Sequence, residues 1–217
     1  DLQIDFKAFK NQIQTVHANG SRQKIKHHNE HIIIDKNELK IGQNKIKIKY
    51  NAGDDALNRS ANFLYTLFVP DRMRTSFPSF DQPNLKATFE LTLRVPESWE
   101  TMSSTTIARE TQRNRKKIVR FKKSDKMSTY LFSFVAGRFI KIKAVLDGLE
   151  MTMLHREPDT EKVNRNLKEI FSLHKDSINY MENYTGIKFP FQKFGFVLIP
   201  DFQFGGMEHI GAIQYRA

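Results

Sequence analysis

Short hydrophobic runs separated by polar turns dominate the first two thirds of the chain. The runs are β-branched or alternate between apolar and polar positions, as strands with one buried face do. They cover residues 31–34, 44–50, 63–69, 87–95, 117–121, 130–135 and 139–145. Turn sequences such as Asn19-Gly20 fall between them. The pattern predicts an all-β region from residue 2 to about 145.

The spacing of the apolar residues changes after residue 158. The positions that recur at steps of three and four are Val163, Leu167, Ile170, His174, Ile178 and Met181. Pro158-Asp159-Thr160 supplies helix start signals, and Gly186 with Pro190 supplies the stop. The sequence therefore predicts an amphipathic helix over about residues 160–184.

Two further strands are predicted after this helix, at residues 194–199 and 211–215. Together with the helix they indicate the opening of a mixed α/β domain. Asp147-Gly148 has the chemistry of a hairpin turn and lies near the change of pattern. We therefore expect a β-rich domain over residues 1–150 and a second domain beginning at residues 151–217.

Composition narrows the class of protein. No segment of the 217 residues reaches the ~20 consecutive apolar positions that a membrane-spanning helix needs, so no membrane span is expected. The absence of cysteine excludes disulfides and thiolate metal ligands. The first residue is Asp1 rather than Met, which predicts a processed or trimmed start. A soluble protein is expected, either cytoplasmic or exported with its leader absent.

The net charge of +11 makes anionic partners worth weighing. Lysines alternate with apolar residues in Lys45-Ile46-Lys47-Ile48-Lys49-Tyr50, as on a strand with one wet face. Because no known nucleic-acid motif accompanies the charge, scattered solvated faces are the favoured explanation. We therefore do not expect nucleic acid as a partner. A basic nucleic-acid-binding β-domain is kept as an alternative that ranks below two others given below.

Candidate chemistry is sparse when the residues are taken alone. Glu208 follows Gly205-Gly206-Met207, and paired glycines let a backbone approach a ligand, although they more often form a turn or bulge. His27, His28 and His31 lie in a β-like stretch, which favours a hairpin of exposed histidines over a metal site. No H-E-x-x-H motif occurs. No complete metal site or self-sufficient catalytic group is expected.

Three separated stretches nevertheless resemble one family, the aminopeptidase N-type zinc metallopeptidases. Residues 74–89, RTSFPSFDQPNLKATF, are similar to the family's R-x-x-F-P-C-F-D-E-P-x-x-K-A-x-F. Residues 130–139, YLFSFVAGRF, resemble its Y-L-x-A-F-x-V-G-x-F. The segment from Pro200-Asp201-Phe202 through Gly205-Gly206-Met207-Glu208-His209 resembles its I-P-D-F-x-x-G-A-M-E-N. The three occur in the family's order.

This resemblance implies a saddle-like antiparallel β-sheet N-terminal domain. The first helix and strands of a thermolysin-like α/β catalytic domain would follow it. It also implies a zinc-dependent enzyme that releases N-terminal amino acids from peptides with a free N-terminus. In the family, the H-E-x-x-H helix that binds zinc lies beyond the point that matches residue 217. We therefore expect a truncated catalytic domain that is inactive alone, with the zinc ligands outside these residues.

The resemblance also assigns roles to particular residues. Glu208 would bind the α-amino group of the substrate, Gly205 and Gly206 would hydrogen-bond the extended peptide, and Met207 would line the first side-chain pocket. His209 stands where the family usually has Asn. The family's second amine anchor aligns with Val69, and Asp71 could replace it if the local register shifts by two.

A noncatalytic relative that serves as a protein-interaction scaffold is the main alternative to the peptidase. An H-E-x-x-H motif in the downstream sequence of the parent gene would separate the two.

Overall fold

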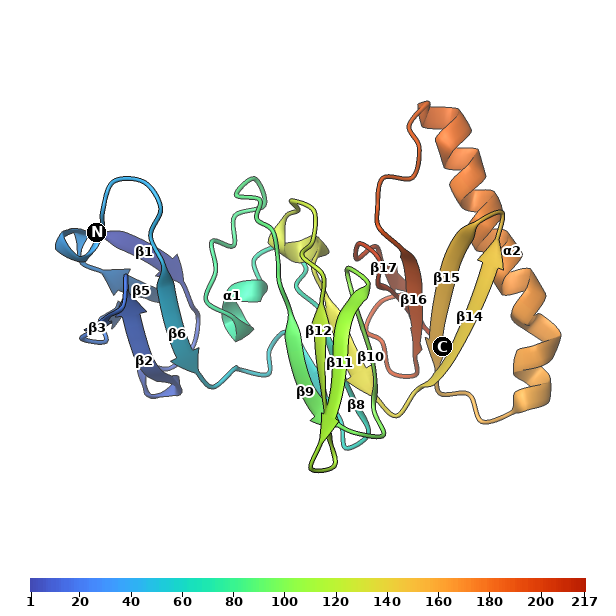
Figure 1. The fold of residues 1–217 in the computed structure, drawn as a ribbon, viewed down its shortest axis with the longest axis horizontal. Helices are drawn as coiled ribbons and strands as arrows, with labels where there is room; N and C mark the ends of the chain where they lie inside the picture. The colour runs from blue at the N-terminus through green and yellow to red at the C-terminus, as the bar shows by residue number, and fades with distance from the viewer. The chain divides into compact units, whose positions relative to one another are not determined.

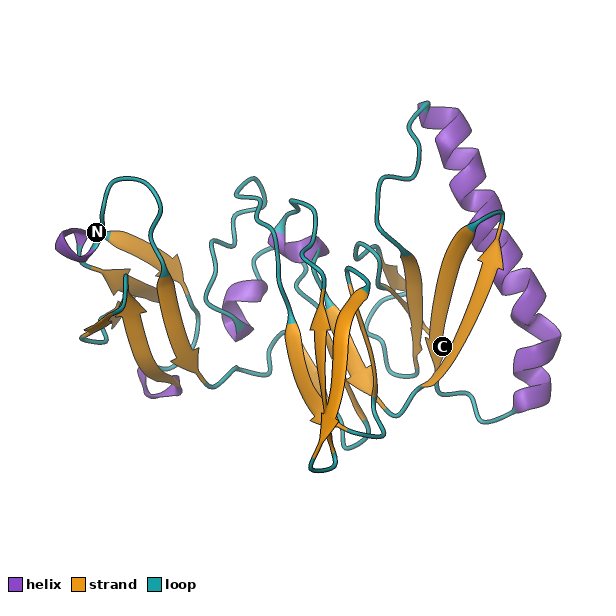
Figure 2. Cartoon of the chain, viewed as in Figure 1, coloured by secondary structure: helices purple, strands orange, loops and turns teal.

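The computed structural model describes residues 1–217. The chain forms two compact units. The first comprises residues 1–60, 64–87 and 127–131, and the second comprises residues 61–63, 88–126 and 132–217. Strands dominate both, and the protein contains one long helix (Figure 2). The expected mainly β fold, with several antiparallel sheets, a long helix and a mixed sheet, is confirmed.

Two three-stranded sheets share the core of the first unit. One has the order β1-β5-β4 and the other β3-β2-β6. Their bounds are β1 Leu2–Asp5, β2 Ile13–Ala18, β3 Ser21–Gln23, β4 His27–His28, β5 His31–Ile34 and β6 Ile46–Tyr50. Buried side chains from both sheets, among them Phe6, Val16 and Ile32, pack into one cluster. β6 alternates between half-buried and exposed residues, as the sequence of residues 45–50 predicts, and β5 alternates between half-buried and buried ones.

The rest of the first unit consists of short elements. They are the hairpin strands β7 Leu57–Arg59 and β8 Phe63–Thr66, of which Phe63 is assigned to the second unit, the short helix α1 Met73–Ser76, and 3-10 turns at Lys10–Gln12, Lys36–Glu38 and Thr129–Leu131. The histidine stretch forms the expected hairpin, with His28 opposite His31 in the β4–β5 pair. His28 is exposed, whereas His27 and His31 are half-buried.

The second unit contains two antiparallel arrangements and one mixed sheet (Figure 1). The antiparallel strands are β9 Thr92–Pro96, β10 Glu100–Ser103, β11 Ile107–Arg113, β12 Lys116–Phe121 and β13 Phe134–Gly137. β11, β12 and β9 form a three-stranded sheet in that order, and β10 pairs with β13. The mixed sheet consists of β14 Ile140–Leu146, β15 Leu149–His155, β16 Phe194–Ile199, β17 Gly206–Met207 and β18 Ile213–Arg216.

The order of the mixed sheet is β14-β15-β16-β18-β17. The β15–β16 and β16–β18 pairs are parallel, and the two outer pairs are antiparallel. Helix α2, Thr160–Thr185, connects the parallel strands β15 and β16 and packs its apolar side on the sheet through Phe171 and Ile178 (Figure 1). Asp147 (φ 49°) and Gly148 (φ 78°) form the expected hairpin turn between β14 and β15.

Helix α2 has the expected bounds to within one residue. The Asp159 carboxylate accepts a hydrogen bond from the Lys162 backbone N–H at 2.9 Å and caps the N-terminus. Gly186 ends the helix in the left-handed conformation, with φ of 71°.

Several strands are shorter than the sequence predicts: the run at 63–69 is a strand only over Phe63–Thr66, and two other runs differ more. The run at 87–95 becomes a strand only from Thr92, because the segment before it is fixed by Ser124, which hydrogen-bonds the Phe89 backbone. The run at 130–135 begins instead with a 3-10 turn, since Thr129 donates to Asp81 and Ser128 donates to the Pro83 carbonyl. In both places side-chain hydrogen bonds outcompete the strand ladder. The predicted division into residues 1–150 and 151–217 stays a prediction.

Candidate functional site

The predicted binding residues Gly205 to Glu208 lie at an edge of the mixed sheet. β17 is the last strand of that sheet and pairs with β18 alone. Gly206 is opposite Tyr215, and Met207 is opposite Gln214. The Arg216 backbone N–H donates to the Gly205 carbonyl at 3.1 Å. The far side of β17 is therefore the sheet edge.

Backbone direction alternates along a strand, so the pairing shows which groups face this edge. The carbonyl of Gly205 points toward β18, and by alternation so do the backbone groups of Met207. The N–H and C=O of Gly206 consequently point away from β18. Such outward groups can pair with an added extended chain.

Position 206 has little room for a side chain. A Cβ atom there would lie 3.0 Å from Cδ1 and 3.3 Å from Cε1 of Tyr215. A Cβ at Gly205 would meet nothing within 4 Å. The two glycines therefore differ: Gly206 lets Tyr215 pack against the edge strand, whereas Gly205 is not required by packing.

Glu208 follows β17 directly and is exposed. Its carboxylate has no hydrogen bond or ion pair with another residue of the chain. Met207 is half-buried. A free carboxylate beside outward backbone groups can hold a cationic group on a ligand that lies along this edge.

His209, one residue further on, is completely buried. Burial lowers the pKa of its imidazole to about 3, so the ring is neutral at physiological pH. Neither ring nitrogen has a hydrogen-bond partner within the protein. His209 is thus an interior side chain that anchors the turn after Glu208.

The half-buried side chain of Lys193 fixes the same turn. Lys193 Nζ donates to the Gly211 carbonyl at 2.5 Å, and burial lowers the pKa of this lysine to about 7. Gly211 has φ of +65°, and a Cβ there would lie 2.4 Å from the Ser104 carbonyl oxygen. A Cβ at Gly195 on β16 would lie 2.7 Å from Lys193 Nζ. The turn that carries Glu208 is therefore held between β16 and the chain at Ser104.

Lys193 was not predicted from the sequence. Its only sequence signal is its position between the aromatic residues Phe191 and Phe194, which also suits an exposed lysine at a strand end. Its role becomes visible only when the 209–212 turn is placed on it.

Asp71, the remaining predicted residue, lies in the first unit. Both of its carboxylate oxygens are bound by Arg74: Nε contacts Oδ1 at 2.5 Å and Nη2 contacts Oδ2 at 2.8 Å. Hydrogen bonding to Arg74 lowers the pKa of Asp71, and Arg74 also pairs with Glu30. Asp81 accepts from the Arg74 backbone N–H at 3.0 Å. Within residues 71–81, Asp71 and Asp81 therefore both bind Arg74.

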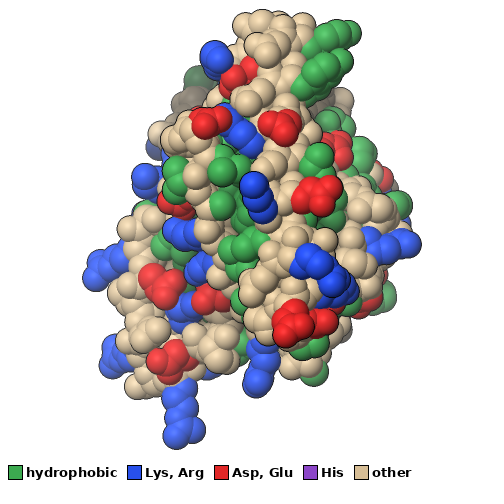
Figure 3. All heavy atoms as spheres, turned by 90° about the vertical axis from the view of Figure 1, so that its right-hand side faces the viewer, with side chains coloured by type: hydrophobic (Ala, Val, Ile, Leu, Met, Phe, Trp, Pro, Cys, Tyr) green, Lys and Arg blue, Asp and Glu red, His purple; other side chains and the backbone are tan.

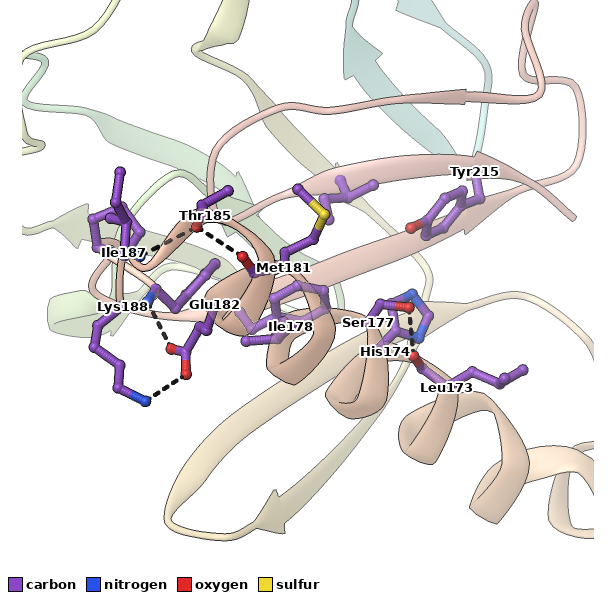
Figure 4. Close-up of a pocket in the computed structure, with 14 residues that line it drawn as sticks. Leu173, His174, Ser177, Ile178, Met181, Glu182, Thr185, Ile187, Lys188 and Tyr215 are labelled. Carbon is purple, nitrogen blue, oxygen red and sulfur yellow. Dashed lines mark hydrogen bonds and ion pairs between the residues drawn. The ribbon is translucent and has the colours of Figure 1, made fainter.

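An apolar groove of about 570 Å³ runs along the C-terminal half of α2 (Figure 4). Its lining includes Leu173, Ile178 and Met181 from the helix, Ile187 after it, and Ile213 and Tyr215 from β18. His174 lies in its wall and stacks on Phe196, with ring centroids 4.2 Å apart. The helical periodicity of the sequence indicates which side of α2 is apolar. It does not indicate the groove, because the groove is lined by residues of both α2 and β18.

No group of three or more His, Asp or Glu side chains lies close enough together to bind a metal ion. The residues present therefore do not fit a zinc ion. No helix combines the length and the apolarity that crossing a bilayer requires.

Comparison with known proteins agrees with the motif around Arg74. Residues 1–131 match the family described as Peptidase M1 N-terminal domain. The chain belongs to the peptidase M1 family. The resemblance noted in the sequence is therefore confirmed.

Several members of the M1 family are similar over most of the chain. Aminopeptidase M1 of Arabidopsis thaliana is 31% identical over 186 residues, which is 82% of this chain and 20% of the relative. Aminopeptidase N of Streptomyces lividans is 28% identical over 158 residues, 71% of this chain and 18% of the relative. The puromycin-sensitive aminopeptidase of Caenorhabditis elegans is 34% identical over 154 residues, which is 70% of this chain and 16% of the relative. This M1 chain spans about a fifth of the length of such relatives.

Proposed function

We propose that this chain is the N-terminal part of a zinc-dependent aminopeptidase, and that the β17 edge binds the substrate. The relatives are aminopeptidases by name, which supports peptides as the substrate class. The observation that carries the proposal is the unpaired carboxylate of Glu208 beside the outward backbone groups of Gly206.

An extended peptide would add to the sheet as a strand next to β17. Its backbone would pair with the N–H and C=O of Gly206, and Met207 would contact the first side chain. Glu208 would then hold the protonated α-amino group in a charge-assisted hydrogen bond. Because a peptide without a free N-terminus offers no cation there, this contact would restrict hydrolysis to the first residue.

The reaction requires a zinc ion, which would activate a water molecule and polarise the first peptide carbonyl. Its ligands would have to lie outside the present 217 residues. We propose that residues 151–217 form the start of the catalytic domain, since they carry helix α2, strands β16 and β18 of the mixed sheet, and the candidate edge strand β17. Asp71 is a weaker candidate for amine binding, because Arg74 already binds both of its oxygens.

Kinetics of the full-length parent test this proposal. Glu208→Gln keeps the shape of the side chain and removes its charge. We expect kcat/KM on dipeptide substrates to fall about 10- to 100-fold, on the scale of a lost charged hydrogen bond. Glu169→Gln is the matched control, because it makes the same change of charge at an exposed glutamate on α2, outside the proposed site. Unchanged kcat/KM in Glu208→Gln would remove Glu208 from the site.

The 217-residue chain alone should not hydrolyse aminoacyl chromogenic substrates when zinc is added. A parent protein that also lacks zinc-dependent hydrolysis would instead favour the noncatalytic scaffold.

A further inference from the structure

The sheet β11-β12-β9 of the second unit has one buried and one exposed face. Val119 and Phe121 on β12 and Val95 on β9 are buried on the inner face. Strand β11 is exposed along its whole length. The cross-strand register places nine residues on the outer face, and all nine are exposed. They are Arg109, Thr111, Arg113, Lys116, Ile118, Arg120, Thr92, Arg94 and Pro96.

The nine residues of this outer face include five cations and no carboxylate; Glu110 on β11 is on the other face and pairs with Lys117. Arg109 is directly opposite Arg120, and Arg113 is directly opposite Lys116. Like charges in such pairs stand only about 5 Å apart at Cβ and destabilise a sheet. Glu90, just outside the sheet, contacts Arg120 at 3.6 Å, and both side chains are largely exposed. One exposed ion pair leaves most of the repulsion in place.

Other parts of the surface do not repeat this arrangement. On β6 the exposed Lys47 and Lys49 are opposite His17 and Thr15 rather than other lysines or arginines. On the α2 side of the second unit, cationic and anionic side chains are interspersed (Figure 3). The outer face of β11-β12-β9 is therefore a concentration of one sign of charge, maintained at a local cost in stability.

We propose that this face is a docking surface for a membrane rich in anionic phospholipids. Three adjacent strands form a pleated surface about 10 Å across, onto which several lipid headgroups can fit. Phosphate and carboxylate groups of the lipids would separate the paired cations and relieve their repulsion. Each cation near such a surface strengthens binding about fivefold.

Ile118 favours a lipid surface over nucleic acid. It lies in the middle strand between Thr111 and Arg94 and is 38% exposed, so it can enter the headgroup layer. The face presents no aromatic side chain on which a base could stack. The outer face thus presents cationic side chains around one exposed aliphatic residue, Ile118.

Vesicle sedimentation tests the proposal on the 217-residue chain. The protein should bind vesicles of phosphatidylcholine mixed with phosphatidylserine, should not bind phosphatidylcholine alone, and should be released as salt is added. Arg109→Glu/Arg113→Glu should weaken binding about 25-fold or more, since two cations are lost. The same variant should keep or raise the melting temperature, because each new glutamate is opposite Arg120 or Lys116.

Lys47→Glu/Lys49→Glu is the matched control, with the same change in net charge on another exposed strand. It should retain most of the binding. Ile118→Ser should weaken binding without changing its salt dependence. Equal losses in the two charge variants, or equal binding to both kinds of vesicle, would overturn the proposal. Duplex or single-stranded nucleic acid that displaces the protein from vesicles at the same salt would reassign the face to nucleic acid.

Discussion

Asp71 and Glu208 are both acidic residues next to family motifs, but the structure uses them differently. Asp71 is exposed, but both of its carboxylate oxygens bind Arg74, three residues along the chain. Glu208 binds no other residue of the chain, and only the turn behind it is fixed, through Lys193 and Gly211. The difference separates a carboxylate that is already paired within the chain from one that is available to a ligand.

The largest effect is expected from the turn behind Glu208. Gly211→Ala should destabilise the second unit by about 3 kcal/mol, because its Cβ collides with the Ser104 carbonyl and its φ is positive. Thermal unfolding of the variant beside Gly205→Ala measures this effect. The Gly205 variant should unfold like the wild type, since its Cβ enters open space. Equal melting temperatures for all three proteins would contradict the account of the turn.

Lys193 should make stability depend on pH. Its folded pKa of about 7 lies below the unfolded value of about 10.4, so between these values the unfolded chain binds the extra proton. Unfolding free energy should therefore rise by about 2 kcal/mol between about pH 7 and 9, and this lysine contributes no slope below its folded pKa. Denaturant unfolding at several pH values in wild type and Lys193→Met checks this. An identical rise in both proteins would show that other groups cause it.

A smaller effect is expected from the paired carboxylates of the first unit. Arg74 lowers the pKa of Asp71 and of Glu30, so their contribution to stability is present at neutral pH and is lost as pH falls through the lowered pKa values. Arg74→Met should lower the melting temperature at neutral pH, and the difference from wild type should shrink in acid. A difference that stays constant with pH would mean that packing, not charge, accounts for it.

The sequence was sufficient for elements whose pattern follows from burial. The helix was predicted because Val163, Ile170 and Ile178 repeat on one side and Asp159 and Gly186 cap its ends. By contrast, β11 was missed because all seven of its residues are exposed and it carries no hydrophobic period. Short strands such as β1 and β2 were also missed. Their pairing with β5 and β6 is set by contacts distant in sequence.

The candidate site was predictable to the same extent. The family motif identified Glu208 and the two glycines as candidate binding residues. It did not show which backbone groups face the sheet edge. That Gly206 rather than Gly205 faces outward depends on the register with Tyr215, which only the folded sheet defines. The burial of His209 and the bond from Lys193 likewise follow from tertiary packing and leave no mark in local sequence.

The contrast between the two carboxylates is tested most directly by an NMR titration of the 217-residue chain. Two tripeptides of the same sequence would be compared, one with a free N-terminus and one acetylated. The free peptide should shift the amide signals of residues 205–209 and bind at least about tenfold more tightly than the acetylated one. Glu208→Gln should abolish that preference, and Asp71→Asn should leave it intact. Equal binding of both peptides, or a preference that survives Glu208→Gln, would contradict the assignment of this strand edge as the amine-binding site.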